Sequence, residues 1–383
     1  MAVIGLDATH LSIYGKGMAR YQYNLIKSLS KLDKKNCYYV FLNKENILPE
    51  LPKQDNFNYI RIYMPKRIIW DQFQLPVITR KYNLDIYHSV LDTLPVFSKT
   101  NFVLFLFEIP DYRIEILSHS GRISLYSYLS RGYNKAFFRR SLRKAKITIA
   151  SSYSTKADLI QKYGIAEKKI RVIYPAADER FCATTSAKDL AGMRKKHNAD
   201  TGYILHISSS DPRDNTQAVI RAYYKALRES KVSQKLIIGG DVDSERMGSE
   251  KLITELNLKD SVIFTGRLPE KELVALYQAA DVYIDPSLYE GFGFQAAEAM
   301  ACGIPVITSN VTALPEVVGD AGILVSPNDI EGLASALVRV LTDSGLRDSM
   351  RQKSLGRAKF FSWDRVAKGN LDVYNELLAE SKV

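Results

Sequence analysis

Short runs of apolar residues alternate with longer segments in which apolar residues recur every three or four positions through most of the chain. Runs of about four to eight apolar residues predict buried strands, whereas the longer periodic segments predict helices with one buried face. In the first half the predicted strands are VIGLD, YYVFLN, YIRIYM, DIYHS, NFVLFLF and ITIASS. Helical periodicity occurs in ARYQYNLIKSLSKL and TKADLIQKYG. Strands that alternate with helices predict a parallel sheet covered by helices on both faces.

The second half repeats this alternation, with predicted strands YILHIS, KLIIGG, SVIFTG, DVYIDP, PVIT and GILVS. At 383 residues the chain is longer than one ordinary domain. Small and polar residues replace the strand pattern over residues 174–189. We therefore predict an α/β protein with two Rossmann-like, doubly wound domains that face each other across a cleft, over residues 1–175 and 176–365. A ligand is expected where the carboxyl ends of both sheets meet this cleft.

The segment YEGFGFQAAEAMACGIPVIT, residues 289–308, places two glutamates eight positions apart around two glycines. It follows the predicted strand DVYIDPS, so Glu290 lies in a loop at the carboxyl end of a strand and Glu298 lies in the first turns of the next helix. Gly291 and Gly293 allow close approaches that side chains would block, and the amides that begin the helix attract an anionic group. Because ionised carboxylates only accept hydrogen bonds, the two glutamates fit the hydroxyls of a sugar and of a ribose, with a diphosphate between them.

The string EGFGFQAAEAMACGIPVIT resembles the signature of retaining glycosyltransferases of the two-Rossmann-domain type (GT-B), in the large family 4, or glycosyl transferases group 1. GKGMARYQYNLIKSL is similar to the first glycine loop and helix of that family, and FSWDRVAKGNLDVYNELL to its closing helix. The resemblance covers nearly the whole chain. It implies that the first domain lies on the acceptor side, that the second binds a nucleotide-sugar, and that a final helix over about residues 366–383 packs back on the first domain.

Carried over residue by residue, the resemblance implies a catalytic role for Glu290, which would bind hydroxyls of the donor sugar. The donor-binding residues that it implies are Glu298 at the ribose, the amides of Phe292, Gly293 and Phe294, Arg267 beside the base, and Gly15 and Gly17 at the diphosphate. It also implies transfer of a hexose, with a UDP-sugar favoured and a GDP-sugar as the alternative, to a hydroxyl of a polysaccharide or lipid-linked acceptor. The nucleotide-sugar is a substrate, and neither a resident cofactor nor a metal is implied.

The second domain departs from the family pattern at the phosphate-binding cations. The donor-site arginine and lysine of the family correspond to Ser209 and Asp214 in SSSDPRDN. Arg213 and Arg20 are therefore candidates to bind the diphosphate instead. If Asp214 faces the diphosphate, its carboxylate opposes binding.

The first domain departs at the histidine that the family usually presents after a central strand. In FLFEIPDY, Phe107 occupies this place, and Glu108 beside it becomes a catalytic candidate that would contact an acceptor or donor hydroxyl. The five histidines of the chain show no metal-ligand spacing. His10 and His88 are notable because both end predicted strands that face the cleft.

Positive charge is concentrated in the first half of a chain whose net charge is +11. The first 175 residues carry 28 Lys and Arg against 13 Asp and Glu, and seven of these basic residues accompany three aromatic residues in residues 131–146. Such a segment is either a solvated helix face with its aromatic rings in the core, or a docking surface for an anionic membrane or a phosphorylated acceptor. No nucleic-acid recognition module accompanies the charge, so nucleic acid is not an expected partner.

The three cysteines are widely spaced, and the sequence shows neither a signal segment nor an apolar run long enough to cross a bilayer. These features predict a cytoplasmic protein, with peripheral attachment to the inner face of the membrane as the extension suggested by the charge. Two alternatives to a transferase stay open. One is a nucleotide-sugar 2-epimerase, which needs acid and base carboxylates around the sugar ring. The other is a non-catalytic nucleotide-sugar-binding scaffold, suggested by Ser209, Asp214 and Phe107.

Overall fold

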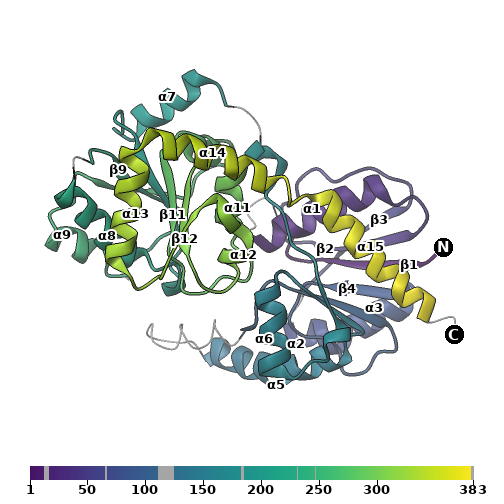
Figure 1. Cartoon of the computed structure of the whole chain (residues 1–383). Coiled ribbons are helices and arrows are strands. Elements are labelled where there is room, and N and C mark those ends of the chain that lie inside the picture. The colour runs from purple at the N-terminus through teal and green to yellow at the C-terminus, as the bar shows by residue number, and fades with distance from the viewer. Residues whose placement is uncertain are drawn as a thin grey trace. The chain divides into compact units, whose positions relative to one another are not determined.

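The computed structural model describes residues 1–12, 17–64, 67–110, 125–182, 185–230, 232–245 and 247–380 (Figure 1). Internal contacts divide the chain into two units, Met1–Ala176 with Ser362–Val383, and Ala177–Phe361. Each unit contains one parallel sheet with helices packed around it. The predicted fold class, with two doubly wound α/β sheets, is confirmed.

Seven parallel strands form the sheet of the first unit, in the order β3-β2-β1-β4-β5-β6-β7. The order reverses direction between β1 and β4, which is where sheets of this kind usually bind ligands. The strands are β1 Val3–Ala8, β2 Cys37–Asn43, β3 Phe57–Ile62, β4 Ile86–Ser89, β5 Asn101–Leu106, β6 Ile147–Ala150 and β7 Ile170–Val172. The helices are α1 Gly17–Leu32, α2 Arg67–Ile69, the π-helix η1 Trp70–Gln74, α3 Leu75–Lys81, α5 Leu125–Lys144, α6 Tyr153–Tyr163, the short 3-10 turn η2 Glu167–Lys169, and α15 Trp363–Glu380.

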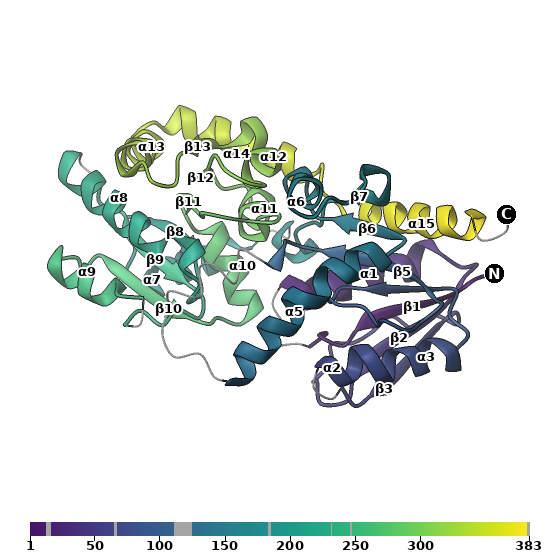
Figure 2. The ribbon, with the colours of Figure 1, turned by 90° about the horizontal axis from the view of Figure 1, so that it is seen from below.

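Helices cover both faces of this first sheet (Figures 1 and 2). On one face α1 packs against α15, the last helix of the chain, and Tyr21, Tyr38 and Tyr374 are fully buried there. On the other face lie α2, α3 and α5, which bury Trp70 and Phe138 in a second apolar cluster. The end of the chain therefore completes the core of the first unit.

Six parallel strands form the sheet of the second unit, in the order β10-β9-β8-β11-β12-β13. The strands are β8 Tyr203–Ile207, β9 Lys235–Gly239, β10 Val262–Gly266, β11 Val282–Asp285, β12 Val306–Ser309 and β13 Ile323–Val325. The α-helices are α7 Ala187–Lys196, α8 Thr216–Glu229, α9 Ser249–Glu255, α10 Glu270–Gln278, α11 Phe294–Ala301, α12 Leu314–Val318, α13 Ile330–Thr342 and α14 Ser344–Ala358. The 3-10 turns are η3 Glu179–Cys182, η4 Pro212–Asp214 and η5 Gly319–Ala321.

Among the described parts of the first unit, the sequence prediction lacks the edge strand β7 and the helical stretch over residues 67–81. The edge strand β7 has three residues, which is too short for its apolar pattern to stand out. The helix over residues 67–81 carries apolar residues on several sides and contains a π-helical segment, so it lacks the regular period that predicts a helix. Within the described residues, no helix is long and apolar enough to cross a bilayer.

Candidate functional site

The loops at the carboxyl edge of the second sheet are joined by backbone hydrogen bonds. The amide of Ser208, after β8, donates to the carbonyl of Gly239 at the end of β9 over 2.8 Å. The amide of Leu288, after β11, donates to the carbonyl of Arg213 over 2.8 Å. Because parallel strands end at the same edge of a sheet, these loops form one connected surface.

Helix α11 begins at this edge, directly after Gly293. Gly293 has φ of 92° and ψ of 61°, a backbone conformation that residues with a Cβ rarely adopt. A Cβ at this position would lie 2.6 Å from Cδ2 of Leu314, so backbone conformation and packing both require glycine. The preceding loop is held by the amide of Glu290, which donates to Oγ1 of Thr312 over 3.0 Å. The first turn of α11 is thereby fixed at the edge of the sheet. The backbone amides of this turn have no carbonyl of a preceding turn to donate to, so they are available to a ligand.

The two glutamates around this turn have different surroundings. Glu298 lies in α11 with 2% of its surface exposed, and the hydroxyl of Tyr277 donates to its Oε2 over 3.2 Å. Glu290 is half-buried in the loop. Between them the ring of Phe292 is buried and packs edge-on against the ring of Phe294, with 5.3 Å between the centroids. A ligand at this segment would therefore meet the backbone of Phe292 rather than its side chain.

Two arginines near this edge are placed differently. The guanidinium of Arg213 donates to both carboxylate oxygens of Asp211, with the shortest distance 2.7 Å from Nη2. Arg267 is exposed directly after β10. It follows Gly266, whose φ of 65° is in the left-handed region. Arg213 is thus already engaged by a carboxylate, while Arg267 lies on the surface.

Asp214 is directed at its own loop. Its Oδ2 accepts hydrogen bonds from the amide of Ser209 over 2.6 Å, from Oγ of Ser209 over 3.0 Å and from Oγ of Ser208 over 3.0 Å. Burial raises the pKa of Asp214 to about 6, against the lowering effect of the Ser209 hydrogen bonds. Residues 209 and 214 therefore contact each other, and the carboxylate of Asp214 braces the loop.

A buried chain of hydrogen bonds continues from this loop into the sheet. Oγ of Ser208 lies 2.7 Å from Oγ1 of Thr216, which lies 3.1 Å from Nε2 of His206. Nδ1 of His206 lies 2.9 Å from the carbonyl oxygen of Ile284, so Nδ1 must carry the proton, because a carbonyl only accepts. Burial lowers the pKa of His206 and favours the neutral ring. The chain ties β8, α8 and β11 together beneath the candidate site.

The first unit carries other predicted residues at the carboxyl edge of its own sheet. Gly17 begins α1, and Arg20 lies half-buried in the first turn of that helix. Glu108 is half-buried two residues after β5. Gly15 lies outside the described residues.

The predicted site residues thus form two groups, one in each unit. The second unit brings together Arg213, Glu290, Phe292, Gly293, Phe294 and Glu298, with Arg267 on the loop that follows β10. The first unit places Gly17, Arg20 and Glu108 at its sheet edge. Among the residues that the structure describes, no three His, Cys, Asp or Glu side chains are grouped so that they could hold a metal ion.

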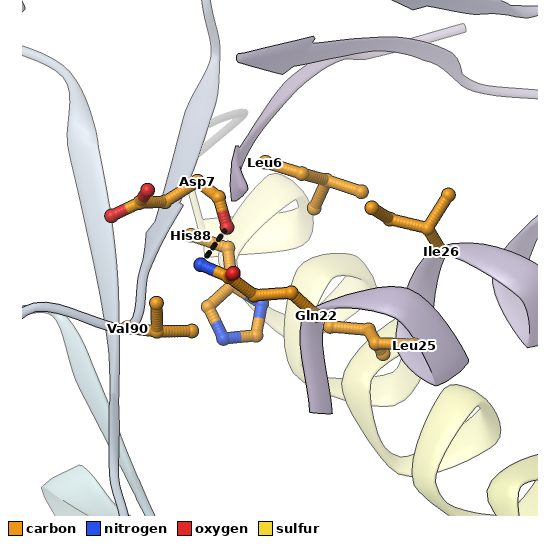
Figure 3. Close-up of a pocket in the computed structure, with 7 residues that line it drawn as sticks. All are labelled: Leu6, Asp7, Gln22, Leu25, Ile26, His88 and Val90. Carbon is orange, nitrogen blue, oxygen red and sulfur yellow. Dashed lines mark hydrogen bonds between the residues drawn. The ribbon is translucent and has the colours of Figure 1, made fainter. Parts of the chain in front are cut away.

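His88, at the end of β4, is buried inside the first unit. It lines a cavity of about 10 Å³ together with Asp7 and Gln22 (Figure 3). Its Nδ1 lies 2.6 Å from the hydroxyl of Tyr374 in α15, and burial lowers its pKa to about 3. His88 is therefore a buried, neutral residue that links β4 to the last helix, and the cavity has room for about one water molecule.

Sequence patterns also miss a polar cluster built on residues 67–81. Asp71 is fully buried, and its Oδ2 accepts from the hydroxyls of Thr93 and Tyr133 and from Nε of Arg67. Burial raises the pKa of Asp71 to about 6, although Arg67 acts in the opposite direction. The sequence feature that could have indicated this cluster is the carboxylate of Asp71 within the largely apolar run RIIWDQF.

Two family models together match most of the chain. The model described as Glycosyltransferase Family 4 matches residues 15–181, and the model described as Glycosyl transferases group 1 matches residues 192–356. The chain belongs to this glycosyltransferase family. The membership that the sequence motifs indicate is thereby confirmed.

Similar proteins are found among both sequences and solved structures. The O-antigen chain mannosyltransferase B of Escherichia coli is 31% identical over 245 residues, which is 64% of this chain and 64% of that relative, so the match spans less than two thirds of the relative's length. The sucrose-phosphate synthase of Thermosynechococcus elongatus has a TM-score of 0.75 at 21% identity and covers 99% of this chain and 100% of that one. Anabaena Alr3699/HepE in complex with UDP and glucose has a TM-score of 0.71 at 17% identity, over 98% and 99% of the two chains. At such identities the solved structures show the shared GT-B fold.

Both departures from the glycosyltransferase pattern fall on residues with internal contacts. Asp214, in place of the usual lysine, is held by Ser208 and Ser209. Phe107, in place of the usual histidine, packs edge-on against Tyr21 with 5.5 Å between the ring centroids. In this chain both positions therefore support the loops around them, and neither supplies the side chain that the family pattern offers to a ligand.

Proposed function

We propose that this chain is a retaining hexosyltransferase, which moves a hexose from a nucleotide-sugar to a hydroxyl group of a saccharide or lipid-linked acceptor without a required metal ion. One observation carries the proposal: Glu290, the turn at Gly293, the first turn of α11 and Glu298 form one rigid segment at the carboxyl edge of the second sheet. Family membership supports the class of reaction, and this segment supports the chemistry of the donor.

Each part of the segment suits one part of a nucleotide-sugar. The first-turn amides and the dipole of α11 attract the diphosphate and stabilise the negative charge that grows on it as the bond to the sugar breaks. The half-buried carboxylate of Glu290 accepts hydrogen bonds from the hydroxyls of the hexose, and that of Glu298 accepts them from the ribose. Arg267, exposed after β10, lies beside the base.

In the proposed site the diphosphate is bound by the backbone amides of α11 more than by cationic side chains. Asp214 and Ser209 replace the family's cations and satisfy each other, and Arg213 is paired with Asp211. The leaving diphosphate therefore depends on the amides of α11, with Arg20 of the first unit as a further candidate. The acceptor hydroxyl attacks the anomeric carbon from the face that the diphosphate leaves, which retains the configuration, and Glu108 is the candidate to contact this hydroxyl.

Mannose is the first hexose to test, because the E. coli relative is named as a mannosyltransferase. Uridine diphosphate is the first nucleotide to test, because it is bound in the structure of Anabaena HepE. UDP-glucose, UDP-galactose and GDP-mannose would be screened by calorimetry, and the donors that bind would be incubated with saccharide and lipid-linked acceptors. The proposal expects a glycoside with retained configuration and free nucleoside diphosphate. It also expects Glu290→Gln to lower turnover more strongly than donor affinity.

A second candidate function is a nucleotide-sugar-binding scaffold without catalysis. It is favoured because Asp214, in place of the family's lysine, is hydrogen-bonded to Ser208 and Ser209 in its own loop. A scaffold would bind a donor and release no nucleoside diphosphate, with or without acceptors. A 2-epimerase would convert the donor into its epimer while the sugar stayed bound to the diphosphate. Product analysis by NMR distinguishes all three functions, and either of the last two products would overturn the transferase proposal.

A further inference from the structure

A row of apolar side chains runs along the outer side of the helix over residues 67–81. Ile69, Phe73 and Val77 follow one another at intervals of four residues, and their exposed fractions are 45%, 67% and 64%. Large apolar residues of globular proteins are seldom this exposed in a row, and such a row usually marks an interaction surface. The helix lies on the side of the first sheet opposite to α15 (Figure 2).

The opposite side of this helix packs into the first unit, so the row Ile69, Phe73 and Val77 lies on the solvent side. Asp71, Leu75 and Thr79 also follow one another at intervals of four residues, and all three are buried. Asp71 receives hydrogen bonds from Thr93 and Tyr133. Among the residues that the structure describes, this buried side packs within the unit, and the apolar residues Ile69, Phe73 and Val77 lie on the exposed side.

Phe97 is presented beside this row by a tightly held loop. Nζ of Lys144, on α5, donates to the carbonyls of Val96 and Ser98, each over 2.9 Å. These two contacts lie on either side of Phe97, a residue that is 84% exposed. The phenylalanine is therefore held outward by the residues on both sides of it.

The Phe97 loop and the helix are neighbours. The side-chain amide of Gln72 donates to the carbonyl of Leu94 over 3.2 Å and accepts from the amide of Val96 over 2.9 Å. Oγ1 of Thr79 lies 3.4 Å from Oγ of Ser98. Contacts at both ends of the helix thus place the loop along it. We call the resulting surface the apolar face; it consists of Ile68, Ile69, Phe73, Val77 and Phe97.

Basic residues flank the apolar face. Arg80 and Lys81 are exposed at the end of α3, and Lys99 is exposed two residues after Phe97. The nearest exposed carboxylate that follows α3 in the chain, Asp85, accepts a hydrogen bond from the amide of Val3 in β1. The three exposed charged residues that flank the face, Arg80, Lys81 and Lys99, are thus all cationic.

We propose that the apolar face docks on an anionic lipid surface, with the rings of Phe73 and Phe97 and the side chain of Val77 entering the boundary between headgroups and acyl chains. Arg80, Lys81 and Lys99 would then lie at the level of the lipid phosphates. An apolar row with flanking Lys and Arg is the pattern of interfacial helices, and anionic headgroups attract such a flank. The cationic flank favours a lipid surface over a protein partner, whose apolar docking groove would gain little from it.

This surface differs from the basic segment that the sequence suggests for membrane binding. Lys144 of that segment is engaged by Val96 and Ser98. Arg139 lies over the ring of Tyr163, 5.5 Å from its centroid. Their main contribution is therefore to hold the Phe97 loop and the end of α6, while the apolar face supplies the lipid contact. The inference goes beyond the proposed sugar transfer and does not depend on it.

Tryptophan reporters test insertion directly. The full-length variants Phe73→Trp, Phe97→Trp and Leu32→Trp would be mixed with vesicles of equal parts phosphatidylglycerol and phosphatidylcholine, or of phosphatidylcholine alone. Leu32, 50% exposed at the end of α1, is the matched control, and Trp70 and Trp363 of the native chain are buried. The proposal expects a blue shift, and quenching by brominated acyl chains, at positions 73 and 97 on the anionic vesicles only. Unchanged emission at both positions, or equal quenching at position 32, would overturn it.

Loss of binding is the second test. The double variant Phe73→Ser and Phe97→Ser should co-sediment with the anionic vesicles at least about tenfold more weakly than the native chain, whereas Leu32→Ser should not. Replacement of Arg80, Lys81 and Lys99 by Gln should weaken binding at low salt and reduce its salt sensitivity. Circular dichroism would verify that each variant is folded. If the native chain does not bind vesicles, the proposal fails. It also fails if the serine variants abolish a dimer seen by sedimentation velocity without lipid, because the face then serves a protein contact.

Discussion

Tyr277 donates its hydroxyl to the carboxylate of Glu298, so this glutamate is partly satisfied before any ligand binds. Glu290 is less sheltered, because it lies half-buried in a loop whose amide is held by Thr312. The same residue type is therefore placed in two environments within one segment. This difference suits the proposed roles, in which Glu298 binds the ribose, a part that all nucleotide-sugar donors share, and Glu290 binds the hexose.

Replacement of Glu298 by Gln should weaken binding of the nucleoside diphosphate by about 1 to 3 kcal/mol, because in the proposed function an amide would replace a charged acceptor of the ribose hydroxyls. Titration calorimetry with UDP and GDP measures this change. Tyr277→Phe is the control, since it removes the internal donor and leaves the carboxylate in place, and it should weaken binding much less. Equal affinity of native and Glu298→Gln proteins would refute the role given to Glu298.

Asp71 should make the first unit less stable as the pH rises from about 4 to 6. Its pKa in the folded chain is raised to about 6 by burial, so the folded state holds a proton that the unfolded state has already released. That part of the stability is complete below about pH 4 and is lost as the pH passes about 6. Asp71→Asn keeps an acceptor for Thr93 and Tyr133 without the charge.

The measurement for Asp71 is urea unfolding of the native chain and of Asp71→Asn at several pH values. The free energy of unfolding of the variant, relative to that of the native chain, should rise across this pH range, by at most about 3 kcal/mol. Using the difference between the two proteins removes the contribution of the other carboxylates. A difference that does not change with pH would show that folding does not raise the pKa of Asp71.

At the scale of elements, regular apolar patterns predicted strands and helices correctly where one period held over a whole segment. All six strands of the second sheet were predicted from apolar runs, because strands buried on both faces leave an unbroken signal. The helix over residues 67–81 was not predicted, because its π-helical segment shifts the period and its outward residues are apolar. The direction of Asp214 also could not be read from sequence, since it depends on contacts with Ser208 and Ser209 that only the folded loop creates.

The start of α11 depends on a single glycine. Gly293→Ala should destabilise the second unit by about 1 to 3 kcal/mol and weaken donor binding, since the new methyl group would meet Leu314 in a backbone conformation that alanine rarely adopts. Gly356→Ala in α14 is the matched control, because a Cβ there meets nothing within 4 Å, and it should be neutral or slightly stabilising. Thermal unfolding and calorimetry measure both effects. A Gly293→Ala protein with native stability would contradict the packing described for this turn.

At the scale of the whole molecule, the first unit is built from two separate parts of the chain. Helix α15 supplies Val373, Tyr374 and Leu377 to its core, and Tyr374 reaches His88 on β4. Arg171, next to the end of the first part, also pairs with Glu376 on α15. The second unit, by contrast, is one continuous stretch.

A chain that ends at Phe361 should therefore lose the structure of the first unit and keep that of the second. Limited proteolysis followed by mass spectrometry should show early cuts before residue 176 and protection beyond it. The full-length chain, digested in parallel, should resist cleavage in both units. Protection of the truncated first unit would mean that α1 and the sheet are stable without α15.

The place of α15 also sets an order of events during synthesis. When residue 176 leaves the ribosome, the surface of the first unit that will hold Tyr374 is still uncovered, and roughly 10 to 40 seconds pass at ordinary elongation rates before α15 is made. The second unit is complete in sequence during this interval and can fold first, although it comes later in the chain. The unit made first is thus the last to be finished, and for that time its apolar surface around Tyr21 is open to chaperones or to another nascent chain.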